Sequence, residues 1–297
     1  MAGEVPPDIL PDVVLLDGRL VEPEKALVSA FDRGLLFGES VFETLKVVGG
    51  EPCLWSAHSI RLGAACAELG FPIRLQEIEA GVRALLRERP VGRGALRIQV
   101  TGGVQPGGGR GMTAPREGRR PRVVARVDGV TGFEERWYER GVGVITAADL
   151  HRPLPWLKSG SYLASVAAKA RAEEAGAFEC LLMGGEPPGL TEGSFSNLLL
   201  WDGEALVSPP AGHRLPGVTV GVVVEEARVM GITTEERRVT VQEAREGVIL
   251  LTGSLVGVCR CVSLDGRPLV GAGEPSARLR KALEQREATS REHWRVG

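Results

Sequence analysis

Two hydrophobic periods alternate along the chain and predict a mixture of strands and helices. Short apolar or alternating runs, typical of strands, occur at 13–21, 41–48, 51–55, 95–102, 121–127, 141–147, 179–185, 196–203, 204–209 and 247–253. Apolar residues recur at helical spacing at 56–70, 75–89, 161–176 and 219–231. Strands and helices are interspersed throughout, which predicts a mixed α/β (α+β) fold class.

Local signals mark the ends of several of these elements. Asp17-Gly18 and Gly49-Gly50 are typical of tight turns between paired strands. In the helix expected at 56–70, Ser56 is a candidate N-cap and Gly70 suits the C-terminal end. The buried side of this helix is expected to contain Ile60, Leu62, Cys66 and Leu69.

The length of 297 residues predicts one large or two modest domains. Charged residues around 128–140 favour a boundary there. We therefore expect a small N-terminal domain over 1–128, a linker over 129–137 and a larger domain over 138–297.

The composition excludes several classes of function. Hydrophobic residues make up 43% and the formal charge is -2, which fits a globular protein and argues against nucleic acid as a partner. No apolar run approaches the ~20 residues that span a membrane, and the acidic, proline-rich start is unlike a signal peptide. Five cysteines without CxxC spacing argue against a disulfide framework and a structural zinc site. A cytoplasmic protein without metal, membrane or nucleic-acid partners is expected.

Lysines are rare, so chemistry that requires an amine has few candidates. Lys158 follows Pro155, Trp156 and Leu157, and apolar surroundings lower the pKa of an ammonium group toward the range of a nucleophile or base. A solvated surface lysine is the simpler interpretation of this segment alone.

Polar groups gather in three later segments. GLTEGSFSN (189–197) surrounds a single charge, Glu192, with hydroxyl and amide groups, in what otherwise resembles a polar turn. HRLPGVT (213–219) places Val218 and Thr219 at a helix start, where amides suit a phosphate, although a simple helix cap has the same pattern. LLTGSLVGV (250–258) adds Gly253 and Ser254 at a strand end.

The combination is more specific than its members. KSGSYL, TEGSFSN, LPGVT and LTGSL, preceded by FDRGLLFGESVFETL (31–45) and SAHSIRL (56–62), resemble the fold-type IV, class IV family of pyridoxal-phosphate enzymes over about residues 13–270. The resemblance implies a two-domain fold like that of D-amino-acid aminotransferase, with a β-barrel-like C-terminal domain. It also implies pyridoxal 5'-phosphate as cofactor, an amino-acid-like substrate, and a homodimer whose active site lies between the domains near the subunit interface.

The resemblance assigns roles position by position. Lys158 matches the lysine that forms a Schiff base with the cofactor and moves a proton, and Glu192 matches the carboxylate that pairs with the pyridine nitrogen. Tyr162 is expected near the phenolic oxygen, although the family tyrosine sits one residue further along. The phosphate is assigned to Arg61, Val218, Thr219, Gly253 and Ser254.

Two positions depart from the family pattern. Val220 stands where an arginine often follows LPGxT, but a phosphate held by helix amides does not need that arginine. CRCV (259–262) replaces a usual proline in a region that lies near the substrate in relatives.

Three features favour 4-amino-4-deoxychorismate lyase within the family. SAHSIRLGAACAELG resembles the lyase helix, and Thr44 aligns with a threonine that assists proton transfer. GGGRGM (107–112) resembles the lyase GGRGY loop, whose arginine meets a substrate carboxylate. The substrate side is therefore assigned to Arg110 and Phe42.

Other members of the family stay open as alternatives. The RxH pair of D-amino-acid aminotransferases and the tyrosine-arginine pattern of branched-chain enzymes are not evident, but many class IV aminotransferases lack both. An amino acid aminotransferase or an (R)-amine transaminase is the alternative. A catalytically silent binding protein is disfavoured, because Lys158 and Glu192 are both present.

Overall fold

The structure, a computed structural model, describes residues 12–105, 111–112, 117–129, 135–269 and 274–296. The chain divides into two compact units. The first contains Met1–Thr131, Lys158–Ser161 and Ser290–Gly297, and the second contains Gly132–Leu157 and Tyr162–Thr289. The segment around Lys158 thus belongs by its contacts to the first unit, although the sequence places it far along the chain. The division into folding domains expected from the sequence stays a prediction.

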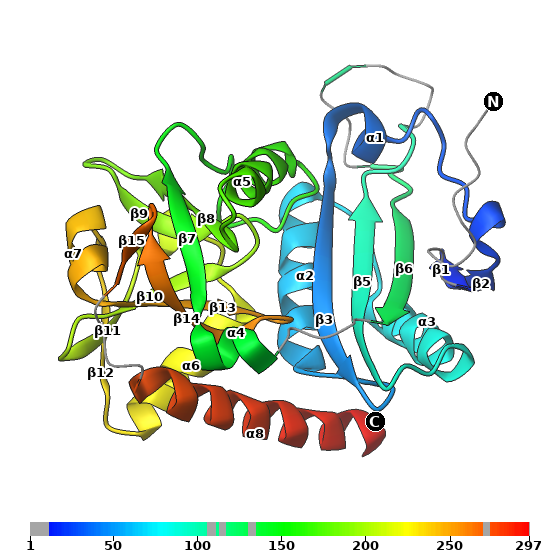
Figure 1. The fold of residues 1–297 in the computed structure, drawn as a ribbon. Coiled ribbons are helices and arrows are strands. Elements are labelled where there is room, and N and C mark those ends of the chain that lie inside the picture. The colour runs from blue at the N-terminus through cyan, green and yellow to red at the C-terminus, as the bar shows by residue number, and fades with distance from the viewer. Residues whose placement is uncertain (1–11, 106–110, 113–116, 130–134, 270–273, 297) are drawn as a thin grey trace. The chain divides into compact units, whose positions relative to one another are not determined.

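The first unit is built on an antiparallel sheet with the order β2-β1-β6-β5-β3-β4 (Figure 1). Its strands are β1 (Val14–Leu16), β2 (Arg19–Val21), β3 (Ser40–Val48), β4 (Glu51–Pro52), β5 (Arg93–Thr101) and β6 (Arg122–Gly129). Both expected hairpins are confirmed. Asp17 and Gly18 adopt left-handed conformations, with φ of 48° and 80°, as a two-residue turn between twisted strands requires.

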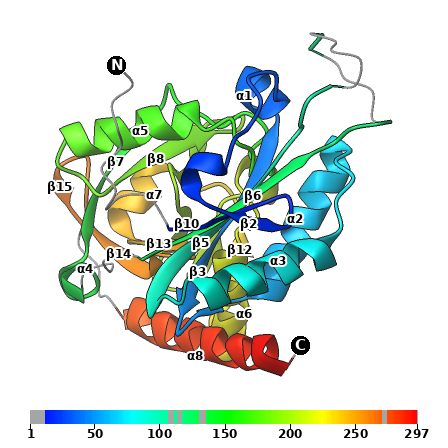
Figure 2. The ribbon, with the colours of Figure 1, turned by 90° about the vertical axis from the view of Figure 1, so that its right-hand side faces the viewer.

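Two helices, α2 (Trp55–Leu69) and α3 (Leu75–Glu88), pack on this sheet. The unit also contains the short helix α1 (Arg33–Phe37) and a 3-10 turn, η1, over Pro23–Lys25. α2 packs on β3, whereas α3 packs on β1, β2 and β6 (Figure 2). Alternation along β3 places Val41, Leu45 and Val47 in the core, so the even-numbered residues of the strand face the other way.

The start of α2 differs from the expectation. Its N-cap is Leu54 in a left-handed conformation, not Ser56, and Ile60 is 70% exposed rather than buried. Ile60 lies two residues from Leu62, about 200° around a helix, so it cannot share the buried side that Leu62 and Cys66 occupy. At the start of the helix the ring of Trp55 packs edge-on against Trp294, with centroids 4.9 Å apart. Gly70 ends the helix as expected.

The C-terminal helix, α8 (Glu274–Val296), is an element that the sequence analysis missed. Its residues from Ser290 onward belong to the first unit. There Ser290 accepts a hydrogen bond from the Leu54 amide at 2.9 Å, and the Arg83 guanidinium lies 3.8 Å from the centre of the Trp294 ring.

The second unit contains a β-barrel. Its strands are β7 (Val142–Ala147), β8 (Glu179–Gly184), β9 (Gly189–Gly193), β10 (Asn197–Trp201), β11 (Ala205–Ser208), β12 (Thr233–Glu236), β13 (Val248–Gly253), β14 (Gly257–Leu264) and β15 (Arg267–Pro268). The order β10-β13-β14-β7-β8-β9 closes on itself because β9 also pairs with β10. The closing pair is Asn197 with Glu192. β11 and β12 extend the sheet beyond β10.

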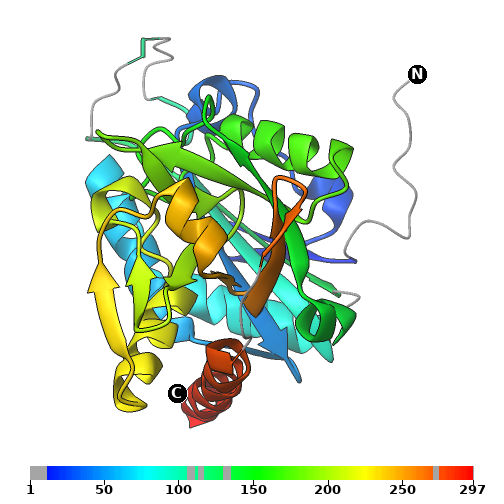
Figure 3. The ribbon, with the colours of Figure 1, turned by 60° about the vertical axis from the view of Figure 1, so that its left-hand side comes forward.

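Apolar side chains fill the core of this unit. They include Leu181, Leu198, Ile249 and Leu251, together with Cys259 and Cys261 from the CRCV segment. The helices of the unit are α4 (Glu135–Arg140), α5 (Leu163–Glu174), α6 (Val218–Val229), α7 (Val241–Glu246) and the first part of α8, and a 3-10 turn, η3, covers Ala211–His213. α5 packs on β8, α6 on β12 and β13, and α7 on β13 (Figure 3).

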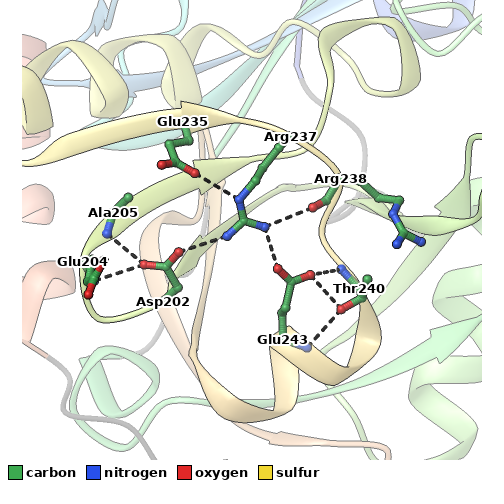
Figure 4. Close-up of polar contacts among 8 residues, drawn as sticks. All are labelled: Asp202, Glu204, Ala205, Glu235, Arg237, Arg238, Thr240 and Glu243. Carbon is green, nitrogen blue, oxygen red and sulfur yellow. Dashed lines mark hydrogen bonds and ion pairs between the residues drawn. The ribbon is translucent and has the colours of Figure 1, made fainter.

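A polar cluster fastens the outer strands to α7 (Figure 4). Arg237 donates to Asp202 at 3.0 Å, to Glu235 at 3.0 Å and to Glu243 at 2.6 Å. Glu243 also forms a reciprocal capping box with Thr240 at the start of α7. One guanidinium therefore joins the β10–β11 turn, β12 and α7.

Candidate functional site

Lys158 lies beside the free edge of β3. The Phe42 amide donates to the Lys158 carbonyl at 3.0 Å, and the Gly160 amide donates to Ser40 at 2.7 Å. These two bonds make Lys158 and Phe42 direct cross-strand neighbours, whose side chains share a sheet face. The Lys158 Nζ lies 4.6 Å from the centre of the buried Phe42 ring. The apolar surface expected beside Lys158 is therefore Phe42, whereas Trp156 is 45% exposed.

Two further polar side chains share the sheet face of Phe42. Thr44 follows two residues along β3 and pairs across the sheet with Arg97 of β5. The Arg97 guanidinium lies 3.9 Å from the centre of the Phe42 ring. Lys158, Thr44 and Arg97 are thus arranged around one aromatic ring, which brings an amine, a hydroxyl and a fixed positive charge to one half-buried surface.

The opposite face of β3 carries a buried carboxylate. Glu43 is 1% exposed. It accepts two hydrogen bonds from Arg61, at 2.7 and 2.6 Å, and one from His58 at 2.7 Å. His58 and Arg61 lie three residues apart on α2, so both side chains point to the same strand. Arg61 is thereby held in one orientation by a bidentate contact.

The charges in this cluster can be assigned. Burial would raise the pKa of Glu43, but the hydrogen bonds from Arg61 and His58 outweigh it and lower the pKa to about 2. Burial lowers the pKa of His58, and the nearby Glu43 does not offset this. Glu43 is therefore ionised and His58 neutral at physiological pH, so the Nδ1–H of His58 donates a hydrogen bond rather than forming an ion pair.

Glu192 is a buried carboxylate of the second unit. It lies at the end of β9 and is 3% exposed. Its Oε1 accepts from Arg152 at 3.1 Å, and its Oε2 accepts from the Leu215 amide at 3.1 Å. Arg152 also donates to the carbonyl of Leu157, the residue before Lys158, at 3.1 Å. The segment 189–197 is mostly strand, and only 194–196 form the expected turn.

The start of α6 lies close to Glu192. The helix begins at Val218 with Gly217 as N-cap, and no side chain caps this end. The first amides of a helix lack intrahelical partners, so those of Val218 and Thr219 can receive an anion. Thr219 is buried and Val220 points into the core, where a valine fits and an arginine would not.

A second orphan group lies beside Glu192 and Asn197. Cross-strand pairing places Glu192, Asn197 and Thr252 in one row over β9, β10 and β13. The Thr252 hydroxyl is buried and has no hydrogen-bond partner among the residues that the structure describes. Gly253 ends β13, and Ser254 follows in the next turn. The sequence analysis noted Gly253 and Ser254 but missed Thr252, because a threonine within a strand looks like an ordinary β-former.

The remaining expected residues are distributed as follows. Tyr162 occupies the N-cap position of α5 and is half-buried. Arg110 lies outside the described residues. Arg97 and Arg152 were missed, since single arginines in an arginine-rich chain carry no signal by themselves. Among the described residues, no group of His, Cys, Asp or Glu is suited to hold a metal ion, and no helix is long and apolar enough to cross a membrane.

Comparison with known proteins identifies the class of this chain. The family model described as amino-transferase class IV matches residues 40–264. D-alanine aminotransferase from Bacillus licheniformis is 30% identical over 270 residues, which cover 88% of this chain and 91% of that protein.

Solved structures give the same class. 4-Amino-4-deoxychorismate lyase from Pseudomonas aeruginosa is 29% identical, with a TM-score of 0.80 and coverage of 92% of this chain and 98% of that one. Branched-chain amino acid aminotransferase from Escherichia coli has a TM-score of 0.83 at 22% identity, covering 92% and 94% of the two chains, which shows the shared fold.

The chain is therefore a two-domain α+β protein of fold-type IV. It belongs to the class IV aminotransferase family, whose members are enzymes that depend on pyridoxal 5'-phosphate. The residues present fit that cofactor. The amine of Lys158 suits the cofactor aldehyde. The phosphate suits the Arg61 guanidinium, which the buried, ionised Glu43 holds, together with the uncapped amides of α6 and the orphan hydroxyl of Thr252.

We expect Glu43 to contribute to stability in a pH-dependent way. Its pKa falls from 4.5 in the unfolded chain to about 2 in the fold, so its contribution is fully present above about pH 4.5 and is lost as the pH falls toward 2. The free energy of unfolding of the apo form should therefore be about 3 kcal/mol lower in Glu43→Gln than in the wild type near neutral pH. Urea denaturation between pH 2 and 8 measures this difference, which should shrink below pH 4.5.

Glu77→Gln is the matched control, because Glu77 pairs with Arg74 on the surface and is 68% exposed. Its stability should match that of the wild type at every pH. A Glu43→Gln difference that persists undiminished at the lowest pH would contradict the assigned charge of Glu43.

Proposed function

We propose that the protein is a 4-amino-4-deoxychorismate lyase, which releases pyruvate and 4-aminobenzoate. The observation that supports this most directly is Thr44, whose place two residues from Phe42 puts a hydroxyl on the sheet face that Lys158 shares. Such a hydroxyl suits a reaction in which protons must both leave and arrive near one lysine.

In this proposal the residues divide between holding the cofactor and moving protons. Arg61, the amides of Val218 and Thr219, and the Gly253–Ser254 turn would hold the phosphate. Glu192 would pair with the pyridine nitrogen and keep it protonated, and Tyr162 would bind the phenolic oxygen. Lys158 would bind the cofactor aldehyde in the resting enzyme, and its amine would be released to act as a base when the substrate amine takes its place.

The bound cofactor supplies an electron sink for the bond broken next to the substrate amine. Lys158 then takes the proton from the ring carbon that bears the amine. The carbon–oxygen bond to the enolpyruvyl group breaks, the ring becomes aromatic, and the departing enol gains a proton to become pyruvate. Thr44 donates or relays a proton beside Lys158, so the reaction is balanced without a keto acid or an external oxidant.

Substrate carboxylates require cationic partners. Arg110 is the residue proposed for this role from its motif, and Arg97, fixed over the Phe42 ring at 3.9 Å, adds a second positive charge on the face of Lys158. Phe42 supplies a flat apolar surface for the substrate ring. Two guanidinium groups suit a substrate that has two carboxylates.

An amino acid aminotransferase is the second candidate. Arg97 alone is sufficient to bind the carboxylate of an amino acid on this face. The relative from Bacillus licheniformis is named a D-alanine aminotransferase, and the matched region covers 91% of that protein. A transaminase differs from the lyase in one observable way, because it turns over only when a keto acid accepts the amine.

We further propose a homodimer. The segment before and within α1 exposes several large apolar side chains, among them Leu27 at 72%, Phe31 at 57% and Leu35 at 70%. Exposed apolar groups clustered in this way are typical of a protein interface, and a twofold pair of identical chains is the usual closed assembly.

The covalent link is tested by chemical trapping. Borohydride reduction of the yellow holoenzyme, followed by peptide mapping, should place the modification on Lys158. The absorbance near ~410–420 nm should be lost with it. Lys169 is the internal control, because its Nζ donates to the Phe178 carbonyl at 2.9 Å. Label on Lys169 would overturn the assignment.

The reaction is tested by coupling the purified protein to chorismate, glutamine and an aminodeoxychorismate synthase. The lyase should form 4-aminobenzoate and pyruvate in equal amounts without added keto acid. Thr44→Val should lower kcat by about 10-fold or more, because a positioned proton donor contributes about 10²–10⁴-fold, while Thr44→Ser should retain most of the rate.

One result decides against the lyase. It is amine transfer from D- or L-amino acids to a keto acid with no 4-aminobenzoate formed, which supports the aminotransferase. Full lyase activity in Thr44→Val leaves the lyase assignment in place and refutes the proposed role of Thr44 in proton transfer.

The assembly is tested by sedimentation. A Phe31→Ser/Leu35→Glu variant should sediment as a monomer at micromolar concentration where the wild type is a dimer, because burying a new charge in an interface is costly. Val229→Glu, at a position that is 79% exposed on α6, should leave the dimer intact. A wild-type protein that is monomeric and fully active refutes the dimer.

A further inference from the structure

Asn197 lies where the barrel closes and where two parts of the second unit meet. It is the first residue of β10, is 6% exposed, and pairs across the sheet with Glu192. Buried amides persist in proteins when their hydrogen bonds are satisfied. The contacts of this side chain therefore show what it does.

The Asn197 amide forms a triangle with Glu192 and Leu215. Its Nδ2 donates to the Leu215 carbonyl at 3.0 Å and lies 3.5 Å from the Glu192 Oε2. The third side is the Leu215 amide, which donates to the same Glu192 oxygen at 3.1 Å. One amide thus ties the carboxylate of β9 to the segment that leads into α6.

The same side chain lies against Gly217, the N-cap residue of that helix. A Cβ placed on Gly217 would lie 1.9 Å from the Asn197 Oδ1 and 3.0 Å from its Cγ. The backbone of Gly217, with φ −66° and ψ 136°, is open to any residue. Glycine is therefore required here by space rather than by conformation, and the helix start packs directly on the Asn197 amide.

Asn197 cannot relax easily, because the turn before it is anchored. The buried carboxylate of Glu179 accepts hydrogen bonds from Ser194 through both its amide, at 3.0 Å, and its hydroxyl, at 2.5 Å. It also accepts from the Ser196 hydroxyl at 2.8 Å. The first and last residues of the turn between Glu192 and Asn197, Ser194 and Ser196, are thus both held by the Glu179 carboxylate.

We propose that Asn197 is a positioning residue that couples the two cofactor-holding elements of this unit, Glu192 and the start of α6. The proposal rests on the roles assigned above to Glu192 and to the Val218 and Thr219 amides. Through Asn197 the carboxylate for the ring nitrogen and the amides for the phosphate are set in one fixed relation. Binding of each end of the cofactor then depends on the other.

The test compares two ligands that differ only in the phosphate. Dissociation constants of pyridoxal 5'-phosphate and of pyridoxal are measured on the apo forms. The constant of pyridoxal divided by that of pyridoxal 5'-phosphate gives the advantage that the phosphate provides. Asn197→Ala should reduce this ratio by about 10-fold, equal to about 1.4 kcal/mol. A variant that is merely less stable lowers the Tm but leaves the ratio unchanged.

A second variant reaches the same contact from the other side. Gly217→Ala leaves Asn197 in place but forces the helix start away from it, so it should reduce the ratio similarly, which keeps the test decisive if Asn197→Ala does not fold. The matched control is Gly221→Ala on the same helix, because a Cβ there meets nothing within 4 Å. Glu192→Gln should weaken the binding of both ligands, because both contain the ring nitrogen.

Ratios in Asn197→Ala and Gly217→Ala within twofold of the wild-type value would overturn the coupling, even if both ligands bind more weakly. If the wild-type protein binds neither ligand, the proposed cofactor roles fail and this inference fails with them. Normal wild-type binding with unchanged ratios contradicts the role of Asn197 alone.

Discussion

The pairing of β9 with β10 is the constraint on which the second unit depends. It closes the barrel, and the residues that meet at the closing pair are Glu192 and Asn197 rather than two apolar side chains. A closed barrel has no free edge, so neither strand can slip without breaking the ladder. A buried carboxylate is costly unless it is hydrogen-bonded. The closure supplies one partner of Glu192, Asn197, and Arg152 and Leu215 donate to it from two loops. The strand pairing that closes the barrel thus also places the Glu192 carboxylate within reach of these donors.

The first unit also contains a buried carboxylate, Glu43, whose partners come from a helix rather than from loops and a neighbouring strand. Glu43 is almost completely buried next to Arg61 and a neutral His58. The carboxylate accepts hydrogen bonds from Nε and Nη2 of Arg61. These bonds orient the guanidinium, and the carboxylate balances its charge. An arginine that must present one edge to an anion needs its other edge held, and a bidentate carboxylate does this with little loss of side-chain freedom at binding. Both units thus contain a buried carboxylate that is fixed by hydrogen bonds beside groups proposed to bind the cofactor.

The sequence predicted the local structure better than the contacts between distant segments. The hairpins at Asp17-Gly18 and Gly49-Gly50 and the helix that starts at Val218 follow from turn chemistry and apolar spacing, and the structure contains them. The expectation for α2 was wrong at Ile60, because that residue lies about 200° around the helix from the buried Leu62. α8 was missed because its sequence is largely polar. Arg152 carried no signal, since its role exists only through its contact with Glu192.

The motifs indicate the family more firmly than the substrate, and the structure gives a physical reason. Two of the groups assigned to the cofactor are over-determined. Glu192 is buried and has partners on β10 and on two loops, and Arg61 is held by a carboxylate with a pKa of about 2. Changing either of them leaves buried polar groups with fewer partners. Thr44 and Arg97, in contrast, lie on a half-buried sheet face, where exchange of one side chain costs little stability. Reaction specificity therefore depends on residues of this face, where the fold imposes few constraints on the side chain. Sequence motifs, which follow the constrained positions, thus identify the family more readily than the reaction.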